Sequence, residues 1–143
     1  MATIKKYEDL EIWQLSRELN KKIYPFLKSL SDSKNYELQK QIDRSAGSIM
    51  DNIAEGFERD GNREFIQFLA ISKASAAEMR SQLYRALDRG LIGKEEFEAF
   101  SNDSIVIGNQ IGKFITYLNN SSIRGKKFIN SSTNPKPETR NSK

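Results

Sequence analysis

Acidic residues near the middle of the sequence have the side-chain type and the spacing that most resemble those of a metal-binding site. Glu55 and Glu58 are three positions apart, so a helix would place them side by side on one face. All-α nucleotide pyrophosphatases coordinate magnesium with two such acidic pairs on adjacent helices. The second pair would begin at Glu78, but Ser81 stands where its second acid should be. The spacing therefore does not predict a magnesium site.

The sequence contains neither histidine nor cysteine. Histidine is the commonest general base and transition-metal ligand, and cysteine supplies thiolate nucleophiles, disulfides and zinc ligands. An enzyme built on this chain would have to use carboxylates, lysine, tyrosine or serine. We therefore predict no catalytic residues, no metal site, no cofactor and no enzymatic activity. A carboxylate–metal enzyme is kept as the last alternative.

A polar stripe runs along the helix predicted in the middle of the chain. At about 100° per residue, one side of this helix carries Leu38, Ile42, Ala46, Ile49, Ile53 and Phe57. Nearly opposite lie Arg44, Ser48, Asp51 and Glu55, where the like charges of Asp51 and Glu55 disfavour the isolated helix. One interpretation is a solvated face with local ion pairs. The others are a polar interface between subunits that includes Asn52, and a ligand site.

Positive charge is concentrated at the C-terminal end of the chain. The formal net charge is +4, but residues 122–143 hold six Lys or Arg against one acid, whereas the rest holds 17 basic and 18 acidic residues. Clustered basic side chains can contact nucleic-acid phosphates, with an affinity that falls as salt rises. The candidates for such contact lie on the predicted first helix and in the tail: Lys21, Lys22, Lys28, Arg124, Lys126 and Lys127.

Apolar residues recur at helical spacing through most of the chain, and no segment shows the alternation of a strand. The first predicted helix begins near Glu8, and Pro25 predicts a kink or break near Tyr24. A break in the last helix is considered at Ser101-Asn102. A polar connection is predicted at 31–35. Three more helices are predicted at 36–57, 63–88 and 94–118, followed by a tail at 120–143.

The last two helices show the heptad spacing of a bundle. Their seams carry the aromatic residues that we expect to fill the core: Phe65, Phe97, Phe100 and Phe114. Gly108 and Gly112 lie one turn apart beside the second seam and predict a close helix crossing. Short connections predict an all-α, antiparallel up-down-up-down four-helix bundle. The predicted domain covers residues 1–119, and a disordered basic tail covers 120–143.

No segment predicts export or insertion into a membrane. The first residues lack the apolar core of a secretory signal, and no apolar run approaches the roughly 18 residues that a membrane span requires. We expect a soluble, cytoplasmic protein without a membrane partner.

Four short motifs between residues 7 and 118 identify a family resemblance. They are Asp9-Leu-Glu-Ile-Trp13, Gln41-Ile-Asp-Arg44, Ser48-Ile-x-x-Asn52-Ile-Ala-Glu-Gly56 and Ser75-x-x-Glu78. Together they resemble the 23S rRNA intervening-sequence proteins, also called four helix bundle proteins, and the third motif is highly specific. The resemblance implies a bacterial four-helix bundle that assembles as a ring-like pentamer. It implies no activity, because the family has no established biochemical role.

The resemblance also implies which positions carry the family signature. These are Arg44, Ser48, Asn52, Glu55, Gly56 and Glu78. Asp43 and Ala76-Ala77 depart from the family pattern, and both departures weaken a nucleic-acid role. With Asp51 from the polar stripe, the predicted oligomer interface comprises Arg44, Ser48, Asp51, Asn52, Glu55 and Glu78.

The leading hypothesis is a non-catalytic, oligomeric four-helix-bundle scaffold or adaptor that contacts structured RNA as an additional property. Its first predicted partner is a further copy of itself, and the resemblance implies a pentamer. RNA or another protein is the second predicted partner. The alternative is an RNA-binding accessory protein similar to those of diversity-generating retroelements, which bind a reverse transcriptase and RNA.

Overall fold

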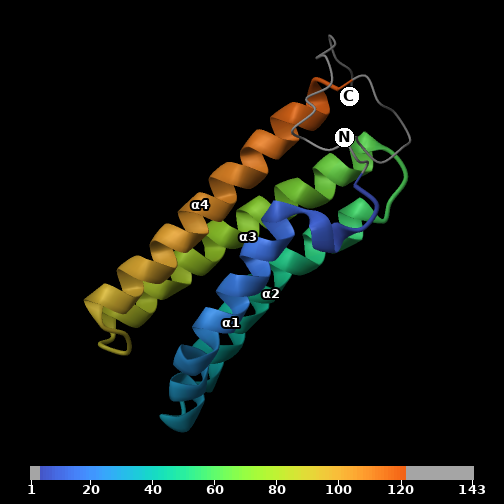
Figure 1. Cartoon of the computed structure of the whole chain (residues 1–143). Coiled ribbons are helices and arrows are strands. Elements are labelled where there is room, and N and C mark those ends of the chain that lie inside the picture. The colour runs from blue at the N-terminus through green and yellow to red at the C-terminus, as the bar shows by residue number, and fades with distance from the viewer. Residues whose placement is uncertain (1–3, 122–143) are drawn as a thin grey trace.

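The computed structural model describes residues 4–121, which fold into one short 3-10 helix and four long α-helices (Figure 1). The elements are η1 (Tyr7–Asp9), α1 (Glu11–Asp32), α2 (Tyr36–Phe57), α3 (Asn62–Asp88) and α4 (Lys94–Asn119). Successive helices run antiparallel, so the predicted four-helix bundle is confirmed. The predicted tail lies outside the described residues from position 122 onward.

The helix boundaries agree with the predicted ones to within two residues except at the start of the chain; α1, for example, includes Ser31 and Asp32 of the predicted connection. The first α-helix begins at Glu11 instead of Glu8, because Tyr7–Asp9 forms a separate 3-10 turn. The backbone N–H of Leu10 closes this turn on the carbonyl oxygen of Tyr7 at 3.0 Å. This turn carries the Tyr7 ring against that of Trp13, with 5.3 Å between the ring centroids.

One apolar core runs along the bundle and receives side chains from all four helices. Its largest fully buried members are Phe57, Leu19, Ile23, Leu30, Ile42, Ile49, Ile53, Leu69, Met79, Leu83 and Ile111. Burial of each such side chain contributes roughly 1.5–3 kcal/mol to folding. The predicted core role of the four seam phenylalanines is confirmed: three are buried, and Phe114 packs on the core edge-to-face with Phe65.

Helices α2 and α3 share the most extensive contact, followed by α3 with α4 and α1 with α2. Helix α1 touches α4 more lightly, through the Phe26 and Phe100 rings and an ion pair between Lys22 and Asp103. Figure 1 shows that the N-terminal segment, the α2–α3 loop and the end of α4 lie at one end of the bundle.

The prediction of a break near Tyr24 is wrong, and the break considered at Ser101-Asn102 is also absent. Helix α1 continues through Pro25, and α4 continues through Ser101 and Asn102. Pro25 lies on the exposed side of α1, while Ile23 and Phe26 on either side of it are buried in the core. Packing of both halves of α1 on the same core therefore keeps the helix continuous despite the missing backbone donor.

The predicted close crossing at Gly108 and Gly112 is wrong. A Cβ atom at Gly108 would meet nothing within 4 Å, and one at Gly112 would meet only the flexible Lys73 side chain, 3.3 Å away. The close crossing lies instead at Gly56 of α2. A Cβ atom there would stand 2.7 Å from the Phe68 Cβ and 2.9 Å from a Phe65 ring carbon of α3.

Replacing Gly56 with alanine should therefore destabilise the protein, because α2 and α3 would have to move apart. We expect Gly56→Ala to lower the free energy of unfolding by about 1–3 kcal/mol, measured by urea titration. Gly108→Ala is the matched control and should raise it by roughly 0.5–1 kcal/mol, because alanine favours the helix where space is open. Equal effects of the two substitutions would contradict the assignment of the crossing to Gly56.

Candidate functional site

The outer face of α2 forms a shallow groove of about 530 Å³. It is lined by Asp43, Arg44, Gly47, Ser48, Asp51, Asn52 and Glu55. These residues recur at spacings of three and four because they occupy one side of a continuous helix, opposite its buried apolar stripe. Five of the six residues predicted as a subunit interface therefore line one groove.

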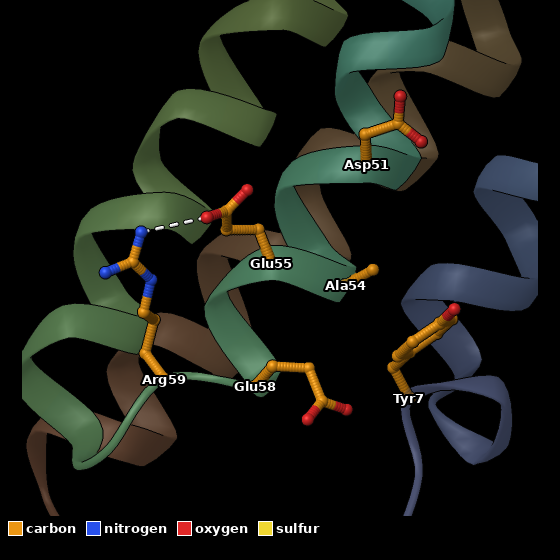
Figure 2. Close-up of a pocket in the computed structure, with 6 residues that line it drawn as sticks. All are labelled: Tyr7, Asp51, Ala54, Glu55, Glu58 and Arg59. Atoms are coloured by element: carbon orange, nitrogen blue, oxygen red, sulfur yellow. Dashed lines mark hydrogen bonds and ion pairs between the residues drawn. The ribbon is translucent and has the colours of Figure 1, made fainter.

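The charges of this groove are incompletely paired within the chain. Among residues 4–121, Arg44 and Asp51 form no hydrogen bond or ion pair with another side chain, and both are exposed. Glu55 accepts a hydrogen bond from the Arg59 guanidinium at 2.8 Å, as Figure 2 shows. Because about half of each of these two side chains is exposed, their ion pair contributes no more than a few tenths of a kcal/mol.

Ser48 and Asn52 differ from their charged neighbours because they are hydrogen-bonded inside the chain. The hydroxyl groups of Ser48 and Ser75 are 2.8 Å apart and join α2 to α3. The amide nitrogen of Asn52 donates to the Ser48 hydroxyl and to the Ser48 carbonyl oxygen. One turn away, the buried hydroxyl of Ser72 donates to the carbonyl oxygen of Ile49 at 2.6 Å.

Glu78, the sixth predicted interface residue, lies exposed on α3 and is not among the residues that line the groove. It stands three positions after Ser75, which contacts α2. The sequence analysis did not single out Gly47 as a member of this face. Its position, three residues after Arg44 and four before Asp51, is the helical spacing that could have identified it.

The α1 lysines predicted to contact nucleic acid are each paired with a carboxylate. Lys21 pairs with Glu18 at 3.3 Å, Lys22 with Asp103 at 2.9 Å and Lys28 with Asp32 at 3.5 Å. These pairs partly cancel the positive charge of the predicted patch. The other three predicted contacts, Arg124, Lys126 and Lys127, lie outside the described residues.

The described part of the chain holds neither a cluster of metal ligands nor a membrane-spanning helix. Residues 4–121 contain no group of three or more acidic side chains placed to hold a metal ion. Nor is any helix within this range long and apolar enough to cross a bilayer.

The α2–α3 hydrogen bonds predict a stability effect at Ser72. Ser72→Ala removes a buried donor and should lower the free energy of unfolding by about 1 kcal/mol in urea titration, since the Ile49 carbonyl oxygen keeps its helical partner. Ser81→Ala, at an exposed position of the same helix, is the control and should change it by less than about 0.5 kcal/mol. Indistinguishable curves would show that the Ser72 contact does not stabilise the bundle.

Comparison with known proteins gives a family and a structural relative. A family model described as 23S rRNA-intervening sequence protein matches residues 8–113. A crystal structure of a protein with unknown function from the S23 ribosomal protein family of Bacteroides thetaiotaomicron has a TM-score of 0.69 to this chain at 28% identity. The alignment covers 73% of this chain and 97% of that one.

A search among curated proteins finds no significant match. The family model nevertheless spans most of the chain, from the 3-10 turn through most of α4. The structural relative has the same fold over nearly its whole length. The chain therefore belongs to the 23S rRNA-intervening sequence protein family.

Proposed function

We propose that this protein is a non-catalytic, homo-oligomeric scaffold whose copies meet through the outer groove of α2. The observation that carries the proposal is Gly47, which lies in the middle of the groove between unpaired charges. A Cβ atom at Gly47 would have no neighbour closer than Asp51 Oδ2, 4.0 Å away. The fold of the single chain therefore does not require glycine at this position.

Glycine inside a helix costs roughly 0.5–1 kcal/mol relative to alanine, and at Gly47 no packing role within the described chain offsets this cost. Gly56, nine positions further along α2, has such a role inside the chain, because α3 occupies the space of its missing side chain. Gly47 faces outward, where the missing side chain lets the backbone of a neighbouring molecule approach. This contrast supports a second copy of the chain as the occupant of the groove.

The charges of the groove support the same occupant. Arg44 and Asp51 lie seven residues apart on α2, which is about 10 Å along the helix axis. Each copy thus carries both a cation and an anion without a partner in residues 4–121. Two copies can pair these charges with each other, which would orient the contact more than it would strengthen it. By resemblance to the family, we propose a ring of five copies.

The test compares two open helix glycines by sedimentation velocity at micromolar concentration. Gly47→Leu fills the groove and should weaken assembly at least tenfold, about 1.4 kcal/mol. Gly108→Leu adds the same side chain on α4, where space is equally open, and should leave assembly unchanged. Unfolding curves would establish that both variants are folded.

Arg44→Ala provides a second measurement on the same face, and it should also shift the equilibrium towards smaller species. A monomeric wild-type protein at micromolar concentration would refute the oligomeric scaffold. An intact oligomer in both Gly47→Leu and Arg44→Ala would refute the α2 groove as its interface.

We propose contact with RNA as an additional property of this scaffold. In the alternative function, an RNA-binding accessory protein, RNA binding is the principal role. The paired lysines of α1 do not favour it, so binding through the bundle should be weak. A titration of 23S rRNA fragments against the full chain, at increasing salt, tests this expectation. Tight binding that survives high salt would favour an RNA-binding accessory protein over the scaffold.

A further inference from the structure

A second groove lies at the C-terminal end of α2, beside the 3-10 turn. It has a volume of about 410 Å³ and is lined by Tyr7, Asp51, Ala54, Glu55, Glu58 and Arg59. Figure 2 shows the carboxylates of Asp51 and Glu55 on α2 and of Glu58 just after its last residue, with Glu55 turned towards Arg59 and the Tyr7 ring facing α2 from the N-terminal segment. The groove thus combines negative charge with the apolar surfaces of an aromatic ring and a methyl group.

The single cation of this groove is already engaged. The Arg59 guanidinium binds Glu55 at 2.8 Å and lies over the Phe68 ring, 4.9 Å from its centroid. Asp51 and Glu58 have no hydrogen bond or ion pair with a cation in residues 4–121. A complementary occupant would therefore carry at least two positive charges and some apolar surface.

The part of the chain that follows α4 has this composition. Residues 122–129, Ser-Ile-Arg-Gly-Lys-Lys-Phe-Ile, carry three cations, three large apolar side chains and no acid. Residues 130–143 contain no large apolar residue, although they hold the other three basic residues of the tail. A tail that only increased solubility would not need apolar residues gathered next to the bundle.

The described chain also stops at the end of the bundle that carries this groove. The side-chain amide nitrogen of Asn62, at the start of α3, donates to the Leu118 carbonyl oxygen of α4 at 3.5 Å. Asn62 follows Glu58 of the groove by only four residues. Figure 1 shows the end of α4 at the same end of the bundle as the α2–α3 loop. The backbone N–H of Ser121 still donates to the Leu118 carbonyl oxygen at 3.2 Å, so only the three steps from Ser121 to Arg124 can be extended, and they span about 10 Å.

We propose that residues 122–129 dock within their own chain into this groove, with Arg124, Lys126 and Lys127 against its carboxylates and the apolar side chains against Tyr7 and Ala54. The acidic start of α4, with Glu95 and Glu96, is out of reach. That helix is about 39 Å long, and eight extended residues span about 27 Å.

The docked segment would share Asp51 and Glu55 with the groove proposed for assembly. The tail and a second copy would therefore compete for these carboxylates. Tail docking does not rest on assembly, since it is a contact within one chain and would exist in a monomer.

The test places a photoreactive phenylalanine analogue at Phe128 of the full chain and maps its cross-links by mass spectrometry. We expect cross-links to Tyr7 and to residues 51–59. Mixing isotopically labelled and unlabelled protein shows whether each cross-link joins one chain or two. The expected cross-links join residues of one chain and weaken as salt is raised.

Two triple substitutions that remove the same charge sharpen the test. Arg124→Ala with Lys126→Ala and Lys127→Ala should lower the cross-link yield about fivefold, because Asp51 and Glu58 lose their cationic partners. Lys136→Ala with Arg140→Ala and Lys143→Ala is the matched control and should leave the yield within about twofold. Cross-links between chains only, cross-links elsewhere on the bundle, or equal losses in both variants would each overturn the proposal. A wild-type monomer would refute the scaffold without affecting this result.

Discussion

The close approach of α2 and α3 at Gly56 is the constraint on which the rest of the structure depends. Without a Cβ at this position, the Phe65 and Phe68 side chains of α3 lie directly against the α2 backbone. Phe65 in turn packs edge-to-face on Phe57 and Phe114, which carries the contact into the core and on to α4. The same approach brings Ser48 and Ser75 within hydrogen-bonding distance.

This contact also determines how α2 is rotated about its own axis. With Ser48 bonded to Ser75 of α3 and the isoleucines in the core, the side of α2 away from both must face outward. That side carries Arg44 and Asp51, whose charges the bundle does not pair. The family motif from Ser48 to Gly56 thus consists largely of residues that hold α2 against α3, and Glu55 is its exposed acid.

Electrostatics differ between the two sides of the α1–α2 hairpin. On α1, the exposed lysines have carboxylate partners on the same helix or on α4, so little net field remains there. On α2, the acids outnumber the cations near the end of the helix, and Arg59 compensates only one of them. The uncompensated charge is therefore negative and lies at the same end of the bundle as the end of α4, which is why we connect it with the basic tail.

Helical periodicity alone determined the helix count, most helix ends and the apolar stripe of α2, because these follow from local spacing and from the residues that end a helix. It also placed the charged groove residues on one face, since they share a single helix. It could not identify which glycine marks the helix crossing, because Gly56 and Gly108 look alike until a neighbouring helix is in place. The same holds for contacts between residues distant in the sequence. Examples are the hydrogen bond between Ser48 and Ser75, the ion pair between Lys22 and Asp103, and the groove beside Tyr7. Only the packing of the helices decides such contacts, because it alone sets which faces meet and at what distance.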